Sequence, residues 1–95
     1  MNERRCYRIE VYTPHDTMAQ VDYYSTCHRA NLREFANDQV ELVAWREGSK
    51  RYWESDRTKS EIEFIDEYSK GCGHRIFDIS VEEFKSAPHA TFDVK

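Results

Sequence analysis

The chain has 95 residues, a formal net charge of −4 at pH 7, and 34% charged against 39% hydrophobic residues. Its 14% of aromatic residues is too high for a disordered, solubilising segment, so we predict one folded domain over residues 1–95. No apolar run approaches the roughly 18 residues of a membrane span, and no signal-peptide core is present. We therefore expect a small, acidic, cytoplasmic protein without a membrane partner.

Two stretches near the N-terminus, CYRIEVYT and AQVDYYS, alternate between apolar and polar residues, as half-buried strands do. We predict that they form a hairpin around PHDT, with Val11 opposite Val21 on an apolar face. This register places Glu10 opposite Asp22 on the other face. Two opposed carboxylates can perform acid–base chemistry, but Arg8 on the same face neutralises one of them, which favours a solvated polar face.

The next segment, STCHRANLREFAND, predicts a short helix that is capped by Ser25 or Thr26 and buries Leu32 and Phe35. The pattern of hairpin and helix then repeats. VELVAWREGSKRYWES predicts a second hairpin that turns at Gly48-Ser49. TKSEIEFIDEYSKG predicts a second helix with a capping box formed by Thr58 and Glu61.

A third strand-like run, HRIFDIS, leads into a short helix that begins at Ser80 and has Glu83 as the second member of its capping box. From Pro88 the polar tail is predicted to be irregular or frayed. The fold class is therefore α+β, with an antiparallel sheet of four to five strands, two main helices on one face and the order ββαββαβ(α). The crude alignment of the two halves is consistent with tandem ββα units.

The periodicity also predicts which apolar side chains form the core. The expected core residues are Ile9, Val11, Val21, Leu32, Phe35, Leu42, Ile62, Ile65 and Phe77.

The segment YSKGCGHRIFD raises the question of a metal or nucleophile site. Gly71 follows Lys70 at the position where a left-handed residue commonly ends a helix. Cys72 and His74 form a Cys-x-His pair, whose spacing is shorter than zinc sites favour, and no orienting residue for a Cys72 nucleophile is identifiable. We predict that neither residue binds metal and that Cys72 packs as a small hydrophobic side chain.

Phosphate-binding glycine loops, nucleophile elbows and His-Glu-x-x-His motifs are all absent from the sequence. We therefore predict a protein that is not an enzyme, with no catalytic residues and no cofactor. The three cysteines are an odd and widely spaced set, so we expect reduced thiols. A thiol or metal-dependent enzyme is the third alternative for the function.

The expected second hairpin is basic and aromatic, which makes it the candidate partner-binding surface. Its residues are Arg46, Lys50, Arg51, Tyr52 and Trp53. Aromatic rings beside positive charges are typical of protein hot spots, but they can also stack bases and contact phosphates. A protein partner is therefore the first expectation, and a small nucleic-acid-binding domain is the alternative.

The second predicted helix offers an alternative acidic interface formed by Glu63, Asp66 and Glu67. Such a face repels a phosphate backbone but can engage a basic protein. A solvated helix face explains the same residues without a partner.

A small, acidic, aromatic-rich α+β chain without catalytic motifs resembles the phage-encoded inhibitors of bacterial defence, such as anti-CRISPR proteins. The resemblance is one of size and composition over the whole chain and transfers no site residues. It implies a stoichiometric protein-binding role. We therefore expect a non-enzymatic inhibitor, encoded by a phage or mobile element, of a host nucleic-acid-handling or defence complex. The sequence does not indicate the oligomeric state.

Overall fold

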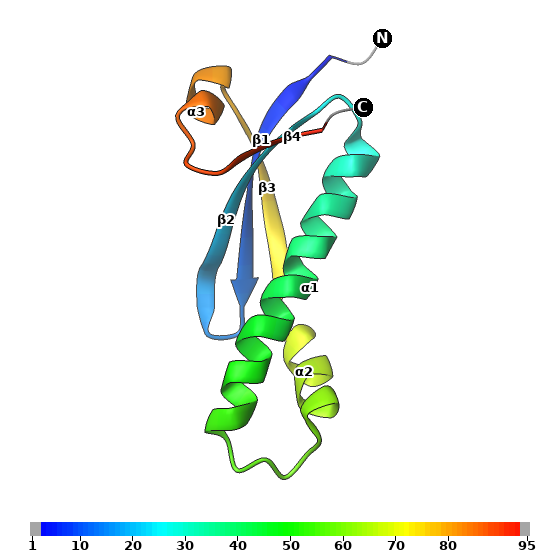
Figure 1. Ribbon diagram of the computed structural model, residues 1–95. Coiled ribbons are helices and arrows are strands. Elements are labelled where there is room, and N and C mark those ends of the chain that lie inside the picture. Colours follow the sequence, from blue (N-terminus) through cyan, green and yellow to red (C-terminus); the bar gives the residue numbers. More distant parts are fainter. Residues whose placement is uncertain (1–2, 94–95) are drawn as a thin grey trace.

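The computed structural model describes residues 3–93 and shows an α+β fold with a mixed four-stranded sheet and one long helix (Figure 1). The elements in chain order are β1 (Arg5–Thr13), β2 (Asp16–Thr26), α1 (Arg29–Glu54), α2 (Glu61–Ser69), β3 (Gly73–Ile79), α3 (Val81–Lys85) and β4 (Ala90–Phe92). In the sheet order β3-β1-β2-β4, β1 pairs antiparallel with β2 and β3, whereas β4 pairs parallel with β2. The α+β class is confirmed, but the wholly antiparallel sheet is wrong.

The predicted second hairpin is wrong, because residues 40–55 belong almost entirely to the 26-residue helix α1. Apolar residues at Ala36, Val40, Val43 and Ala44 follow the helical period and turn toward the protein interior. Gly48 lies inside the helix at a close contact, where an added Cβ would come 3.3 Å from side-chain atoms of α2. The observed order is therefore ββααβαβ, without tandem ββα units.

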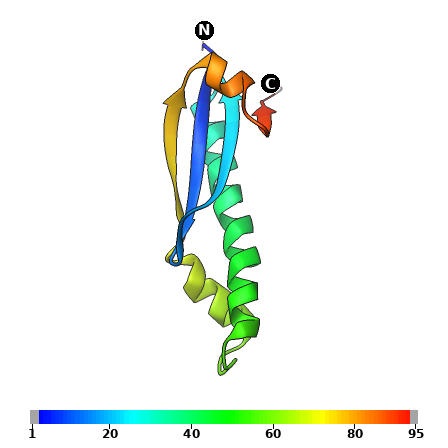
Figure 2. The same ribbon diagram turned by 90° about the vertical axis from the view of Figure 1, so that its left-hand side faces the viewer.

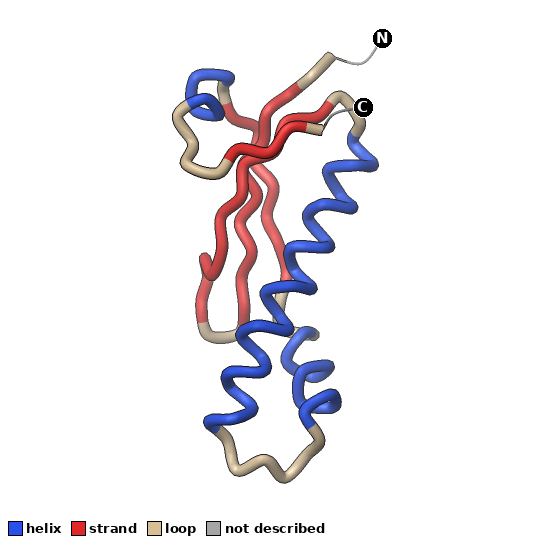
Figure 3. The backbone as a smooth tube through the Cα atoms, in the orientation of Figure 1, coloured by secondary structure: helices blue, strands red, loops and turns tan. Residues whose placement is uncertain are grey.

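The N-terminal half of α1 lies on one face of the sheet, and its C-terminal half continues beyond the β1–β2 turn (Figures 1 and 2). There it pairs with α2, so that the far end of the molecule contains helices and their connecting loop but no strands (Figure 3). The second main helix thus packs on α1 rather than on the sheet face. The elongated chain measures 52 × 23 × 17 Å along its principal axes.

A compact cluster between the sheet and α1 forms the core. Its buried residues are Tyr7, Ile9, Tyr24, Leu32 and Ala36, with Phe35 and Ile76 packed against them. The predicted burial of Ile9, Val11, Leu32 and Ile65 is confirmed, and Val21 and Phe35 are half-buried.

Three residues predicted for the core are instead exposed: Leu42, Ile62 and Phe77. Leu42 lies away from the sheet because its segment is helical rather than extended. Ile62 occupies the first turn of α2, near the exposed loop. Phe77 pairs with Arg8 on the face of the sheet opposite α1, and the Arg8 guanidinium lies 4.9 Å from the centre of its ring.

The first hairpin is confirmed, but its register differs by one residue from the prediction. Ile9 pairs with Asp22 and Glu10 pairs with Val21, so the two carboxylates point to opposite faces. Glu10 lies between two arginines, with its carboxylate oxygens 3.1 Å from Arg8 Nε and 3.7 Å from Arg75 Nε. Asp22 accepts a 2.8 Å hydrogen bond from a neighbouring amide on the α1 side. The pair cannot act as a joint acid–base site.

Side-chain caps fix the two shorter helices. Ser80 accepts a 3.1 Å hydrogen bond from the backbone N–H of Glu83, which confirms the predicted start of α3 and one of the two bonds of its capping box. The Glu83 carboxylate pairs with Arg8 rather than with the Ser80 backbone N–H. The cap of α2 is Ser60 rather than Thr58, and its hydroxyl accepts from the backbone N–H of Glu63. The predicted capping box of Thr58 and Glu61 is therefore wrong, because the cap lies two residues later in the chain.

Gly71 follows α2, but no glycine among residues 3–93 has a positive φ, so its predicted left-handed conformation is wrong. Glycine is needed at this position because the backbone of residue 71 lies close to Pro14. A Cβ at this position would lie 2.5 Å from Cγ of Pro14 in the β1–β2 turn. Gly71 therefore allows the end of α2 to pack against the hairpin.

The C-terminal segment adds the short strand β4 beside β2, which the sequence patterns do not indicate. Asp93 follows it and is only 8% exposed. Its carboxylate accepts hydrogen bonds from Thr26 Oγ1 at 2.7 Å and Asn31 Nδ2 at 2.6 Å, while its backbone N–H donates to the Ser25 carbonyl at 2.9 Å. These bonds join the chain end to β2 and to the start of α1.

Tyr24 provides a pH-dependent test of this packing. Burial, followed by the negative charges of Asp93 and Glu34, raises the pKa of Tyr24 above 10.0. A raised folded-state pKa contributes stability below the unfolded-state pKa, and this contribution is lost as the pH rises through the folded-state value. We expect the melting temperature to fall less steeply above pH 10 in Tyr24→Phe than in the wild type. Tyr12→Phe controls for loss of a phenol, and equal slopes in all three proteins would contradict the prediction.

Candidate interaction site

The candidate site is the end of the helical hairpin, residues 46–62, which projects beyond the sheet and is called the hairpin tip below (Figure 1). Its position follows from the length of α1, because the helix is longer than the strands it packs against. The packing of α2 against α1 determines where the tip lies.

The structure brings together some of the sequence-predicted binding residues and separates others. Arg46, Lys50 and Trp53 follow each other at helical spacings of four and three and share one exposed side of α1. Arg51 is exposed on a different side of the helix. Tyr52 is half-buried, and its ring contacts that of Phe64 on α2 with centroids 5.6 Å apart.

Trp53 is held in place although its residue is 60% exposed. Its indole N–H donates a 3.0 Å hydrogen bond to a carboxylate oxygen of Glu61, and the Ser49 hydroxyl donates to the same oxygen at 2.8 Å. The Arg57 guanidinium lies 5.3 Å from the centre of the Trp53 ring. The exposed ring is therefore positioned by α1, α2 and their connecting loop.

The loop itself adopts an unusual conformation. Arg57 has φ 56°, the left-handed region, and is the one non-glycine residue with positive φ among residues 3–93. Its backbone N–H donates to the Ser55 hydroxyl at 3.2 Å, and that hydroxyl donates to the Tyr52 carbonyl at 2.6 Å. Non-glycine residues in the left-handed region are strained unless their surroundings stabilise them. Here the strained residue is the arginine whose guanidinium lies over the Trp53 ring.

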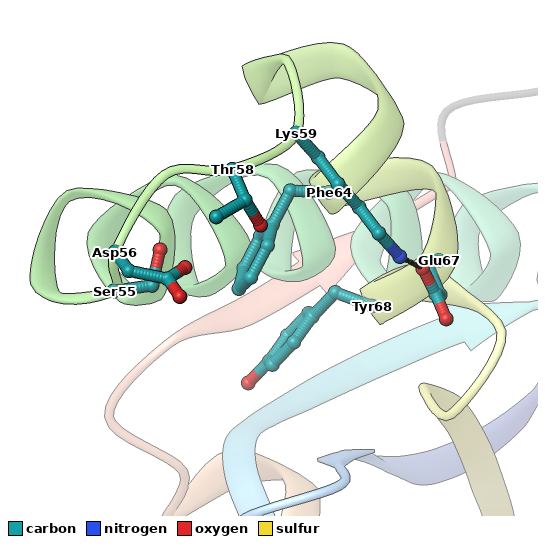
Figure 4. A pocket seen from close by; sticks show the side chains of 7 residues that line it. All are labelled: Ser55, Asp56, Thr58, Lys59, Phe64, Glu67 and Tyr68. Carbon is teal, nitrogen blue, oxygen red and sulfur yellow. Dashed lines mark hydrogen bonds and ion pairs between the residues drawn. The ribbon is translucent and has the colours of Figure 1, made fainter.

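A pocket of about 300 Å³ opens beside this loop (Figure 4). Its lining residues are Ser55, Asp56, Thr58, Lys59, Phe64, Glu67 and Tyr68. The rings of Phe64 and Tyr68 provide an apolar wall, and Lys59 and Glu67 form an ion pair at the rim. This arrangement can accept an apolar side chain from a partner.

The ion pair at the rim is unsuited to proton transfer. Its hydrogen bond raises the pKa of Lys59 and lowers the pKa of Glu67. Both groups therefore stay charged near neutral pH. The Ser55 hydroxyl of the pocket donates to the Tyr52 carbonyl, and no hydrogen bond described for residues 3–93 joins a hydroxyl of the pocket lining to one of its carboxylates.

The alternative acidic face has fewer available carboxylates than its sequence indicates. Glu67 is paired with Lys59, and Glu63 accepts a 3.0 Å hydrogen bond from the Ser60 hydroxyl. Asp66 is exposed on the same helix, and none of the interactions described for residues 3–93 involves its carboxylate. Much of the acidic character thus stabilises α2 itself.

Cys72 immediately precedes β3 and His74 is the second residue of that strand, whereas the Cys27-His28 pair lies beyond β2 at the other end of the sheet. Burial raises the pKa of the Cys72 thiol, which disfavours the nucleophilic thiolate. Within residues 3–93, no three His, Cys, Asp or Glu side chains are grouped in a way that would hold a metal ion.

Sequence reasoning missed two exposed apolar residues on the outer side of α1, Leu42 and Trp45. The two lie beside Asp38 and Glu41 in a shallow hollow. The predicted hairpin concealed this surface, because a strand and a helix distribute the same residues over different faces. A helical reading of the spacing from Asp38 to Trp45 would have found it.

No protein-family model, curated protein or solved structure matches this chain. Among the helices of residues 3–93, none has both the length and the apolar character needed to cross a membrane.

Proposed function

We propose that the protein is a non-enzymatic protein-binding module that contacts its partner through the hairpin tip. The observation that carries the proposal is Trp53, a large aromatic side chain that is exposed and yet held by Glu61 and Arg57. Tryptophan is enriched among the residues that dominate binding energies. A ring already held in one orientation also loses less conformational entropy when it is buried by a partner.

The surroundings of Trp53 supply complementary features. The pocket between Phe64 and Tyr68 can receive an apolar side chain of the partner. Lys50 and Arg51 add positive charge on neighbouring surfaces of the same helix end, which favours association with an acidic partner surface. The Arg46 guanidinium contributes less, because it is paired with Glu47 and also donates a hydrogen bond to Gln20 of β2. The partner's contact region should therefore combine an apolar protrusion with carboxylates.

The resemblance to small phage-encoded inhibitors supports a narrower form of this proposal. In that form, the partner is a host protein or complex in the cytoplasm that handles nucleic acid or acts in defence. Such proteins present grooves and channels that a small elongated module can block. The narrow end formed by α1 and α2 suits insertion into a concave surface (Figure 2).

Nucleic-acid binding is the second candidate, favoured by the basic residues beside Trp53. However, Arg57 lies over the Trp53 ring, while Glu61 accepts a hydrogen bond from the indole. A base that stacks on the face of the ring covered by Arg57 would have to displace the arginine. The nearby carboxylates would also repel phosphates. Protein binding therefore agrees better with the tip.

The test compares two tryptophans on the same helix. Once a partner has been purified from a candidate host lysate, we expect Trp53→Ala to weaken binding about tenfold in titration calorimetry, because it removes a central contact. Trp45→Ala is the matched control, since Trp45 is 50% exposed but lies on the outer side of α1. Circular dichroism should show that both variants are folded.

The reverse pattern, with lost affinity only in Trp45→Ala, would move the interface to the outer side of α1 and refute the tip proposal. Wild-type affinity in both variants would also refute it. The nucleic-acid alternative predicts a gel shift with single- or double-stranded DNA or RNA at low salt. That shift should weaken when Arg46 and Arg51 are changed to glutamate.

A further inference from the structure

Another hollow lies between the N-terminal part of α1 and strand β3, at the opposite end of α1 from the hairpin tip, and is called the β3–α1 groove below. Its volume is about 140 Å³, and its lining residues are Tyr7, Arg29, Leu32, Arg33, Ile76 and Asp78. Tyr7 and Leu32 are buried core residues, and Ile76 packs against them. Core residues therefore form the floor of the groove, while most of its exposed lining is polar.

Strand β3 forms one edge of the sheet. Within residues 3–93 its only strand partner is β1, and Figure 2 shows no element beside its other edge. Alternate residues of β3 therefore direct their backbone N–H and C=O groups outward. An open edge of this kind can pair with an extended segment from another chain.

The rim of the groove carries an excess of positive charge. Arg29 and Arg33 lie one helical turn apart, both are exposed, and the first turn of α1 has no acidic residue. No hydrogen bond or ion pair engages either guanidinium within the described part of the chain. The groove lining contains one opposing carboxylate, that of Asp78.

We infer that the β3–α1 groove binds an extended acidic peptide segment of another protein, which pairs with β3 as an additional strand. The backbone of the peptide would bond to the open edge. Because side chains alternate along a strand, every second one would face α1. One apolar side chain would lie against Ile76, and an acidic one would reach Arg29 and Arg33.

The positive charges beside the groove favour an acidic peptide. Ile76 and Asp78 lie on the α1 side of β3, since they pair with the buried residues Ile9 and Tyr7. A peptide side chain above them therefore meets the two arginines of α1. A carboxylate can form bidentate hydrogen bonds with a guanidinium, whereas a lysine at that position would add a third positive charge.

The test begins with a random octapeptide display library selected on the whole protein. We expect the enriched peptides to contain Asp or Glu two residues from a Val, Ile or Leu. A synthetic peptide of the enriched sequence, with a fluorescent label, then measures affinity by anisotropy. Its matched control peptide carries Asn and Gln in place of Asp and Glu, and it should bind at least about fivefold more weakly.

Substitutions with opposite expected signs make the test specific. Arg29→Ala and Arg33→Ala should each weaken binding of the acidic peptide about two- to fivefold, as expected for exposed charge pairs. Asp78→Asn should strengthen binding by a similar factor, because it removes a like charge. Arg57→Ala at the hairpin tip should leave the peptide affinity unchanged, which separates this inference from the proposed function.

Amide hydrogen exchange distinguishes strand addition from other modes of binding. With the peptide bound, alternate amides of β3 should exchange more slowly. Three results would each overturn the inference: no enrichment of acidic peptides, an affinity indifferent to both arginines, or protection located away from β3. Sedimentation showing a dimer of this chain that β3 variants abolish would assign the edge to self-association instead.

Discussion

Replacing Gly48 by leucine should destabilise the protein by about 2–3 kcal/mol, because four additional carbon atoms would be forced into a close helix–helix contact. Gly48 is buried, and even a single Cβ would lie 3.3 Å from Ile65 Cγ1 and 3.3 Å from Tyr68 Cδ2. Both residues belong to the buried side of α2. The variant should therefore push α2 away from α1 and lower the midpoint of urea unfolding.

The matched control is Lys50→Leu, two residues further along α1 at an exposed position. It adds leucine to the same helix without entering the contact, so its stability should stay within about 0.5 kcal/mol of the wild type. Equal midpoints for Gly48→Leu and the wild type would show that the two helices do not pack at Gly48.

A double-mutant cycle makes the result specific to the contact. Ile65→Ala creates space opposite Gly48, so the loss in the double variant should be smaller than the sum of the two single losses by about 1 kcal/mol. Strict additivity would contradict direct contact. Because the hairpin tip depends on this packing, Gly48→Leu should also weaken partner binding in proportion to the displacement of α2.

The Gly48 contact also explains why sequence patterns failed for residues 40–55. Tryptophan, tyrosine and valine near a Gly-Ser pair are typical of a hairpin. The alternative signal was the apolar spacing from Ala36 to Ala44, which fits a helix turning one side toward the sheet. Packing against the sheet and α2 decides between the two patterns. Neither the sheet nor α2 can be recognised from the short stretch of sequence that contains the patterns.

Local sequence patterns predict an element correctly where a single short-range interaction defines it. The alternation of the first two strands predicts the hairpin, and Ser80 with Glu83 predicts the start of α3. The exact register escaped prediction because the pairing shifts between Val11 and Thr13, an irregularity without a clear sequence signature. Short-range chemistry thus predicts the elements but not their precise alignment.

The sequence predicts which residues belong to the candidate site but not the element that carries them. Trp53 and the basic residues Arg46 and Lys50 do lie together, although on a helix instead of a hairpin. The contribution of Glu61, which orients the indole, depends on α2 folding back along α1. The β3–α1 groove was not predictable either, because it requires β3 to occupy an edge beside α1.

Asp93 illustrates a long-range interaction that no local pattern reveals. Thr26 and Asn31 are more than 60 residues away from it in the chain, yet both donate hydrogen bonds to one of its carboxylate oxygens. Arg4 also reaches this region and donates to the Asp93 carbonyl at 2.6 Å. Arg4 and Asp93, near the two ends of the described part of the chain, are thereby connected to the junction between β2 and α1.

We expect Asp93→Ala to destabilise the protein by about 2–4 kcal/mol, because hydrogen bonds to a charged acceptor are strong and the buried Thr26 hydroxyl and half-buried Asn31 amide would lose this acceptor. The loss should appear as a lower urea midpoint and as faster amide exchange in β4. Asp66→Ala, which removes an exposed carboxylate from α2, is the control and should change the stability by less than about 0.5 kcal/mol. If the two variants were equally stable, Asp93 would not be fixing the C-terminal segment. Thr26→Val should reproduce part of the loss, since it removes one donor while keeping the shape of the side chain.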